Sequence, residues 1–205
     1  SSTVVSCPLS LMPRRSAWRT AAERIAFRAM PHPLVEQLRF TRSEWLRGLE
    51  GVTEEDAAVH HGPNPMNSIG WIVGHLTWQE QRYLLWRSQG RVLFPEIQER
   101  YAYGAPMSTP SLAEMLTAWR TVTAAADPYL DGLGTAGLEA DLPLDGRSVG
   151  QSVGSALRRL TYHYWFHIGE IQAIRQMLGQ RDLPEYVGDI EEQAPYRRED
   201  PVTRG

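Results

Sequence analysis

Residues 153–178 read VGSALRRLTYHYWFHIGEIQAIRQML, and this stretch decides the fold. Its apolar side chains recur in steps of three and four, at Val153, Leu157, Leu160, Tyr164, Ile171, Ile174 and Leu178. That spacing is typical of one face of an α-helix, and an apolar helical face has to be buried. We therefore expect a long amphipathic helix that begins at Ser148 or Ser152 and ends near Gly179, because glycine favours a helix C-terminus.

Two histidines project from the same face of this helix. At about 100° per residue, His163 and His167 lie within roughly 60° of the centre of the face, so both imidazoles are expected to point into the core. A buried polar atom without a partner costs about 1 to 3 kcal/mol, which means that something inside must engage the ring nitrogens. Histidines at i and i+4 stand about 6 Å apart and can reach one divalent cation. Ordinary hydrogen-bonded packing is the alternative, and this segment alone leaves both interpretations open.

Three further amphipathic segments precede this helix. They are expected over residues 33 to about 49, 67 or 68 to about 90, and 111 to between 128 and 132. Ser111, with Glu114 three residues on, has the spacing of a capping box. Because no convincing strand is found, the simplest way to bury four apolar faces is an all-α four-helix bundle. The glycine-rich residues 133–148 are expected to form a short crossover before the last helix.

A third histidine, His75, falls in the first half of the second segment, beside a row of apolar side chains. Gly70 and Gly74 remove side-chain bulk from this helix, so a neighbouring element can approach it closely. Helix bundles build metal sites from inward-facing side chains on different helices. We therefore expect His75 to join His163 and His167 as the third ligand of one divalent cation.

Composition excludes several classes of protein. The net charge of -3 argues against binding to nucleic acid, whose partners usually present a strongly basic surface. All 21 basic residues are arginine, which excludes a catalytic lysine, a Schiff base and pyridoxal chemistry. The single cysteine, Cys7, can form no internal disulfide, and no apolar run approaches the roughly 18 residues of a membrane span. We expect a soluble, cytoplasmic protein without nucleic-acid or membrane partners.

The chain divides into three parts by composition. Residues 1–31 contain five arginines and one acidic residue, Glu23. This composition is typical of an organellar transit peptide, but the segment can also be an extension upstream of a start at Met30. We favour the extension. Within them, residues 16–30 have the apolar spacing of one extra helix. The bundle is expected over residues 32–180. Residues 181–205, rich in charge and proline, are expected to form a surface tail.

The two histidine motifs resemble those of the DinB-like (YfiT-like) superfamily. Members of this family have an early GHL motif and a later HxxxH motif, which correspond here to residues 73–76 (VGHL) and 163–167 (HYWFH), the latter followed by IGEI. The likeness covers about residues 33–180. It implies a bundle with a long connection between the second and third helices, a solvent-open three-histidine site for a divalent metal, and a homodimer.

The resemblance also implies a class of reaction. Three imidazoles leave a coordination position open, unlike structural zinc sites with four protein ligands, and a Zn²⁺ ion there (or Ni²⁺ or Fe²⁺) lowers the pKa of bound water or of a thiol. The family includes isomerases and S-transferases that use bacillithiol or mycothiol. The resemblance therefore implies a thiol S-transferase or hydrolase that acts on a small-molecule substrate, with a low-molecular-weight thiol as cosubstrate.

Two alternatives stay open. One is a non-catalytic, metal-stabilised bundle that acts as a stress-response module. The other is oxygen chemistry at an Fe(II) site, because three nitrogen ligands with open positions suit iron too and DinB-like domains occur in iron-dependent sulfoxide synthases. Those synthases carry a second domain that these 205 residues do not include, which disfavours this alternative.

Two polar residues are candidates to orient the ligands. Glu170 comes three residues after His167, and Gln79 comes one turn after His75. Each is placed either to accept an imidazole proton or to face the open coordination position. For both, a solvated position on a helix surface is the ordinary alternative.

Other side chains near the ligands are candidates for a pocket. Trp78 is expected to line it, as are Trp71 and Trp165, although ordinary packing is the alternative for all three. Arg82, seven residues after His75, is placed to receive a carboxylate of a thiol cofactor or substrate, or else is solvated. The remaining polar candidates are expected to be solvated (His32, His60 and His61) or stay unassigned (Asp141, Asp145 and Arg147).

Overall fold

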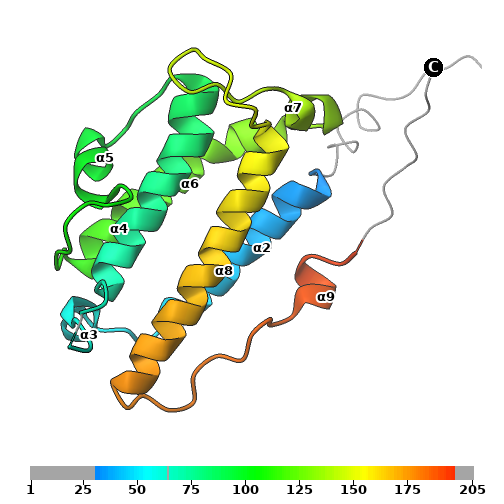
Figure 1. Cartoon of the computed structure of the whole chain (residues 1–205). Coiled ribbons are helices and arrows are strands. Elements are labelled where there is room, and N and C mark those ends of the chain that lie inside the picture. The colour runs from blue at the N-terminus through cyan, green and yellow to red at the C-terminus, as the bar shows by residue number, and fades with distance from the viewer. Residues whose placement is uncertain (1–30, 64, 197–205) are drawn as a thin grey trace, which may run out of the picture. The chain divides into compact units, whose positions relative to one another are not determined.

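A computed structural model describes residues 31–63 and 65–196 of the chain. Residues 1–30 lie outside the described ranges. They include the expected helix over residues 16–30, the rest of the N-terminal extension and Cys7. The described part is all-α, as expected, and its only β-pairing consists of two isolated bridges. Figure 1 shows the four long helices, α2 (Pro33–Leu49), α4 (Ile69–Glu80) continued by the π-helix η1 (Gln81–Arg87), α6 (Leu112–Asp131) and α8 (Val153–Met177).

Serine side chains cap three of these helices. Ser68, Ser111 and Ser152 each accept a hydrogen bond from the amide three residues further on, which satisfies a backbone donor that the first helical turn leaves free. The long last helix therefore begins after Ser152 and not after Ser148. At the start of α6, the carboxylate of Glu54 from the short helix α3 (Glu54–Ala58) accepts two more amides, at 2.7 and 2.8 Å.

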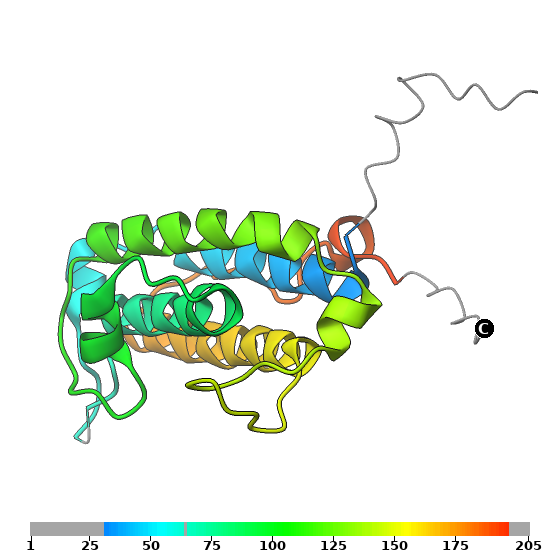
Figure 2. The ribbon, with the colours of Figure 1, turned by 90° about the horizontal axis from the view of Figure 1, so that it is seen from above.

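The helix directions follow from contacts at the helix ends. Helices α2 and α8 are parallel, since the carbonyl of Gly48, near the end of α2, accepts a hydrogen bond from Arg175, near the end of α8, at 2.6 Å. Arg87, which ends η1, instead reaches Gln151, just before α8, at 2.5 Å, so α4 and η1 are antiparallel to α8. In Figure 2, α6 and α2 form one layer of the bundle and α4 and α8 form the other.

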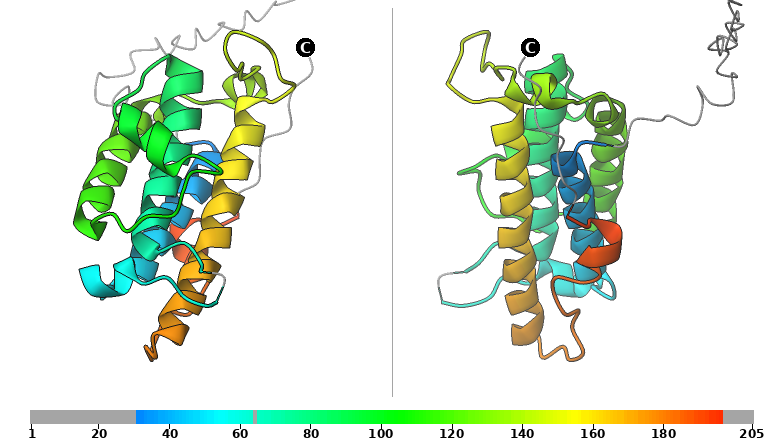
Figure 3. Two further views of the ribbon diagram at one scale, coloured as in Figure 1. Left: turned by 60° about the vertical axis from the view of Figure 1, so that its left-hand side comes forward. Right: turned by 90° about the vertical axis from the view of Figure 1, so that its right-hand side faces the viewer.

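The connection between the second and third long helices crosses the length of the bundle. Ser68, which caps α4, donates to the carbonyl of Ser108, just before α6, at 2.9 Å, so α4 and α6 begin at the same end. Residues 91–111 therefore have to return along the bundle, and they contain the helix α5 (Pro95–Tyr101) on the way. Figure 3 shows this return segment against α4. The long crossover connection of the expected fold is confirmed.

The structure also differs from the expected elements. Four short helices were not expected from the sequence: α3, α5, α7 (Thr135–Glu139) and α9 (Ile190–Gln193). Each has four to seven residues, which are too few to show a helical periodicity. The second long helix was expected to remain α-helical to about Gly90, but its last part, η1, is wound as a π-helix. No helix in the described ranges combines the length and the apolar character needed to cross a membrane.

One polar network in the interior of the bundle includes a buried ion pair. Arg42 of α2 donates to both carboxylate oxygens of Glu80 of α4, at 2.7 and 2.6 Å. The hydroxyl of Tyr164 of α8 donates to Glu80 at 2.9 Å and accepts a hydrogen bond from Trp119 of α6 at 2.6 Å. The network thus connects all four long helices, and each member satisfies the polar atoms of another.

Candidate metal centre

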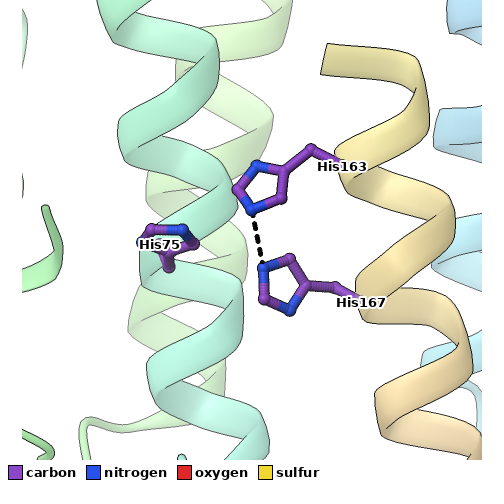
Figure 4. A group of neighbouring side chains, drawn as sticks. All are labelled: His75, His163 and His167. Atoms are coloured by element: carbon purple, nitrogen blue, oxygen red, sulfur yellow. Dashed lines mark hydrogen bonds between the residues drawn. The ribbon is translucent and has the colours of Figure 1, made fainter. Parts of the chain in front are cut away.

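Three histidines from two helices meet between α4 and α8. Figure 4 shows His75 projecting from α4 toward His163 and His167, which project from α8. One nitrogen of each ring lies within 4.8 Å of the corresponding nitrogens of the other two. The Nε2 atoms of His163 and His167 are 3.0 Å apart. The structure therefore brings together the three side chains that the sequence analysis singled out.

The backbone of α5 fixes the orientation of His75. Its Nδ1 lies 2.6 Å from the carbonyl oxygen of Tyr101. A carbonyl can only accept, so Nδ1 carries the proton and Nε2 keeps its lone pair. This contact depends on Gly74, because a Cβ at that position would lie 2.8 Å from the ring of Tyr101. The close approach that Gly74 was expected to permit is thus the one that orients a candidate ligand.

A carboxylate fixes the orientation of His167. Its Nδ1 lies 2.7 Å from Oε2 of Glu170, one turn further along α8. The carboxylate accepts the Nδ1 proton, which leaves the Nε2 lone pair facing the other rings. A histidine that donates its second N–H to a carboxylate is a common arrangement in metal centres, where it sets the tautomer and raises the basicity of the ligand.

The environment keeps two of the rings neutral. Burial, opposed by the hydrogen bond to the Tyr101 carbonyl and assisted by the neighbouring His167, lowers the pKa of His75 to about 4. Burial, followed by the two other histidines, lowers the pKa of His163 to about 3. At neutral pH these two imidazoles therefore hold no extra proton that a cation would have to displace.

The donor set and its spacing suit a divalent cation. Two nitrogens bound tetrahedrally to one Zn²⁺ at about 2.0 to 2.1 Å stand about 3.3 Å apart, close to the 3.0 Å between His163 and His167. All three nitrogens lie within 4.8 Å of one another, so binding one ion would require the rings to approach each other by up to about 1.5 Å. Within the described residues the cluster consists of three side chains, so it would leave a coordination position for water or substrate.

Aromatic rings enclose His75. Trp71 stacks on it with ring centroids 4.9 Å apart and planes 12° apart, and the ring of Trp78 lies at 5.2 Å with its plane tilted by 35°. The indole of Trp78 is held by a hydrogen bond of 2.6 Å to Gln98. The guanidinium of Arg82 lies over the ring of Trp78 at 5.1 Å. Trp71 and Trp78 thus contact the ring of His75, and Arg82 lies behind Trp78. None of the three forms a hydrogen bond with a nitrogen of His75 in the described structure.

Gln79 does not accept the Nδ1 proton of His75, which was one of the two roles that its spacing suggested. That proton goes to Tyr101, and Oε1 of Gln79 is buried with no hydrogen-bond partner in the described structure. The other role, facing the open coordination position, stays a prediction. The first role failed because the competing acceptor is a backbone carbonyl in the crossover. Any residue type carries such a carbonyl, so no sequence pattern marks Tyr101 as a partner of His75.

The other candidate residues lie elsewhere. His32 caps α2 through its Nδ1, and His60 contacts the carbonyl of Met66 at 2.7 Å. His61 was expected in solvent, but its Nε2 is buried without a hydrogen-bond partner in the described structure. Trp165 packs on Phe40 and Tyr186.

Comparison with known proteins identifies one family. A sequence profile of the DinB superfamily matches residues 37–171, which include the three clustered histidines and Glu170. A search of curated proteins returned no match.

Proposed function

This chain belongs to the DinB superfamily, and we propose that it is a metal-dependent enzyme in which His75, His163 and His167 hold a divalent cation. The proposed cation is Zn²⁺, with Ni²⁺ and Fe²⁺ as alternatives that the same nitrogen donors accept. The proposed reaction is transfer of a low-molecular-weight thiol to an electrophilic small molecule, or hydrolysis by water at the same position.

One observation carries the proposal. Tyr101 and Glu170 each accept an Nδ1 proton, so the Nε2 lone pairs of His75 and His167 are both directed at the space between the helices. A packing histidine would normally satisfy both of its nitrogens with protein partners. Here the two Nε2 atoms of His163 and His167 face each other at 3.0 Å, a pair that needs a proton or a cation between them.

The chemistry follows from an open three-nitrogen site. A cation bound there would make a coordinated thiol or water acidic near neutral pH, without any protein nucleophile. In the transfer, the thiol gives up its proton, its sulfur bonds to the electrophilic carbon, and the leaving group departs with its electron pair. The residues of the chain would orient the ligands through Tyr101 and Glu170 and shield one side of the site with Trp71 and Trp78.

Elemental analysis of the purified protein tests the metal site. We expect about one equivalent of metal in the wild type and a loss of most of it in His163→Ala. His60→Gln is a matched control, because it replaces a histidine outside the cluster whose contact with Met66 a glutamine can imitate. Equal metal contents in wild type and His163→Ala would disprove the site.

Turnover assays separate the enzyme from the non-catalytic alternative. Bacillithiol or mycothiol with monochlorobimane would report thiol transfer, and p-nitrophenyl acetate would report hydrolysis. We expect activity with one of these reagents that is lost in His163→Ala. A protein that binds metal but turns over neither reagent, with or without thiol, would favour a metal-stabilised stress-response module. The expected homodimer in the cytoplasm is also part of the proposal, and sedimentation equilibrium tests the dimer.

A further inference from the structure

A cleft of about 740 Å³ lies between η1, the N-terminal half of α8 and the loop over residues 144–151. Four of the residues that line it are arginines, Arg82, Arg87, Arg158 and Arg159, and none is acidic. This concentration of positive charge stands out in a chain whose net charge is -3. Four guanidinium groups without a carboxylate among them repel one another, which a bound anion would relieve.

The π-helical winding of η1 helps to build this cleft. In an α-helix, residues five apart point about 140° away from each other, so Arg82 and Arg87 would face different sides. In a π-helix the hydrogen bonds run from i to i+5, and residues five apart come close to the same face. Both arginines line the cleft. Single π-helical turns inside α-helices often occur at functional sites. Here the π-helical winding brings Arg82 and Arg87 toward the same face of the helix.

The four arginines have different tasks. Arg87 donates to the carbonyl oxygens of Leu142 and Pro143 and to the side chain of Gln151, so it fastens the loop that closes one side of the cleft. Arg82, Arg158 and Arg159 take part in none of the ion pairs of the described structure, although Arg82 lies over the rings of Trp78 and Tyr83. Three guanidinium groups are therefore available to a ligand, and each can bind a carboxylate or phosphate through two parallel hydrogen bonds.

The cleft adjoins the three-histidine cluster from two directions. Arg159 precedes His163 by one turn on α8, so the two side chains are neighbours on that helix. Arg82 lies over Trp78, whose ring packs on His75. A molecule bound by these arginines would thus have its uncharged part near the proposed metal ligands.

We infer that this arginine cleft binds the anionic end of a small molecule that carries at least two carboxylate or phosphate charges, while its other end reaches the three-histidine centre. The identity of the ligand as substrate or thiol cosubstrate rests on the proposed function. The anion site itself rests on the cleft, its charge and its closing loop.

Titration of the full chain with inorganic pyrophosphate and with succinate tests this inference. Calorimetry on metal-free protein keeps chelation out of the measurement, and the two probes separate phosphate from carboxylate recognition. We expect saturable binding of at least one probe, weakened about tenfold or more in Arg82→Gln/Arg159→Gln and weakened further by added salt. If the double variant folds poorly, the single variant Arg159→Gln replaces it in the test, because Arg159 is exposed. We expect this single variant to lose part of the affinity.

Arg120→Gln is the matched control, because Arg120 is an exposed arginine of α6 outside the cleft. Its affinity should stay within about twofold of the wild type. The inference is overturned if the wild type binds neither probe, if Arg82→Gln/Arg159→Gln and Arg159→Gln bind like the wild type, or if Arg120→Gln loses as much as they do. Metal content measured on the protein as purified, before the metal is removed for calorimetry, separates the two proposals: anion binding by a protein that carries no metal as purified rejects only the proposed function, and metal without anion binding rejects only the cleft.

Discussion

Arg42 and Glu80 form a bidentate ion pair in the interior of the bundle, with nitrogen–oxygen distances of 2.7 and 2.6 Å. The carboxylate of Glu80 is fully buried, and the side chain of Arg42 is 7% exposed. Tyr164, which lies between two histidines of the α8 motif in sequence, donates a third hydrogen bond to the same carboxylate. The ion pair joins α2 to α4, and the hydrogen bond from Tyr164 joins Glu80, on the helix that carries His75, to the helix that carries His163 and His167.

Removing one partner of this ion pair should be strongly destabilising. Glu80→Gln leaves the buried charge of Arg42 without its main counterion, and such changes cost about 3 to 5 kcal/mol. The double variant Arg42→Met/Glu80→Leu removes both charges and should be closer to the wild type than Glu80→Gln is. Urea denaturation measures the free energy of unfolding of each. Arg39→Gln serves as control, since it breaks a partly exposed ion pair with Asp131 and should cost less than about 1 kcal/mol. A loss in Glu80→Gln as small as in Arg39→Gln would contradict the prediction.

The bundle and its histidines could be predicted from the sequence because both depend on local periodicity. The spacing of His163 and His167 places both on the interior face of one helix, whatever the rest of the chain does. Serine caps and long apolar faces likewise mark the start and extent of α4, α6 and α8. These signals lie within one helix, so they need no knowledge of the tertiary structure.

The remaining features depend on contacts between distant segments. Arg42 and Glu80 are 38 residues apart, and nothing in the local sequence around either residue indicates a buried partner so far away. The acceptor for His75 is the main chain of Tyr101, 26 residues away, which has no side-chain signature. The arginine cleft combines residues of η1, α8 and the loop over residues 144–151, and the π-helical winding of η1 is a property that hydrophobic spacing does not report.

The metal-free protein should lose stability as the pH falls from about 6.5. In the unfolded chain the imidazoles titrate near pH 6.5, whereas burial lowers the pKa of His75 to about 4 and that of His163 to about 3. Between these values the unfolded state binds protons that the folded state does not, so each ring lowers the free energy of unfolding by up to about 1.4 kcal/mol per pH unit. Denaturation at pH 7 and pH 5 measures the effect. His75→Gln/His163→Gln should show a weaker dependence over this range, and an unchanged dependence would contradict the assignment.

Gly74→Ala should be destabilising, because the added Cβ would lie 2.8 Å from the ring of Tyr101. The contact cannot be relieved without moving α5 and the carbonyl that orients His75, so we expect a loss of about 1 to 3 kcal/mol together with weaker metal binding. Gly169→Ala is the matched control: its Cβ would meet nothing within 4 Å, and alanine favours the helix by up to about 1 kcal/mol. Thermal unfolding of the two variants should therefore shift in opposite directions. Similar shifts would show that the approach of Tyr101 to α4 is not tight.

Glu170→Gln should weaken metal binding while leaving the fold intact. The carboxylate accepts the Nδ1 proton of His167 at 2.7 Å, and a neutral amide supports that tautomer and the basicity of Nε2 less well. Substitutions of this kind reduce metal affinity about 10- to 100-fold. Competition with a chromogenic zinc chelator measures the affinity, and circular dichroism verifies the helical content. Because the side chain of Glu170 is 19% exposed and lies at the edge of the core, the free energy of unfolding of the metal-free protein should change by less than about 1 kcal/mol. If zinc binds to Glu170→Gln as tightly as to the wild type, then His167 is not a ligand whose orientation depends on this carboxylate.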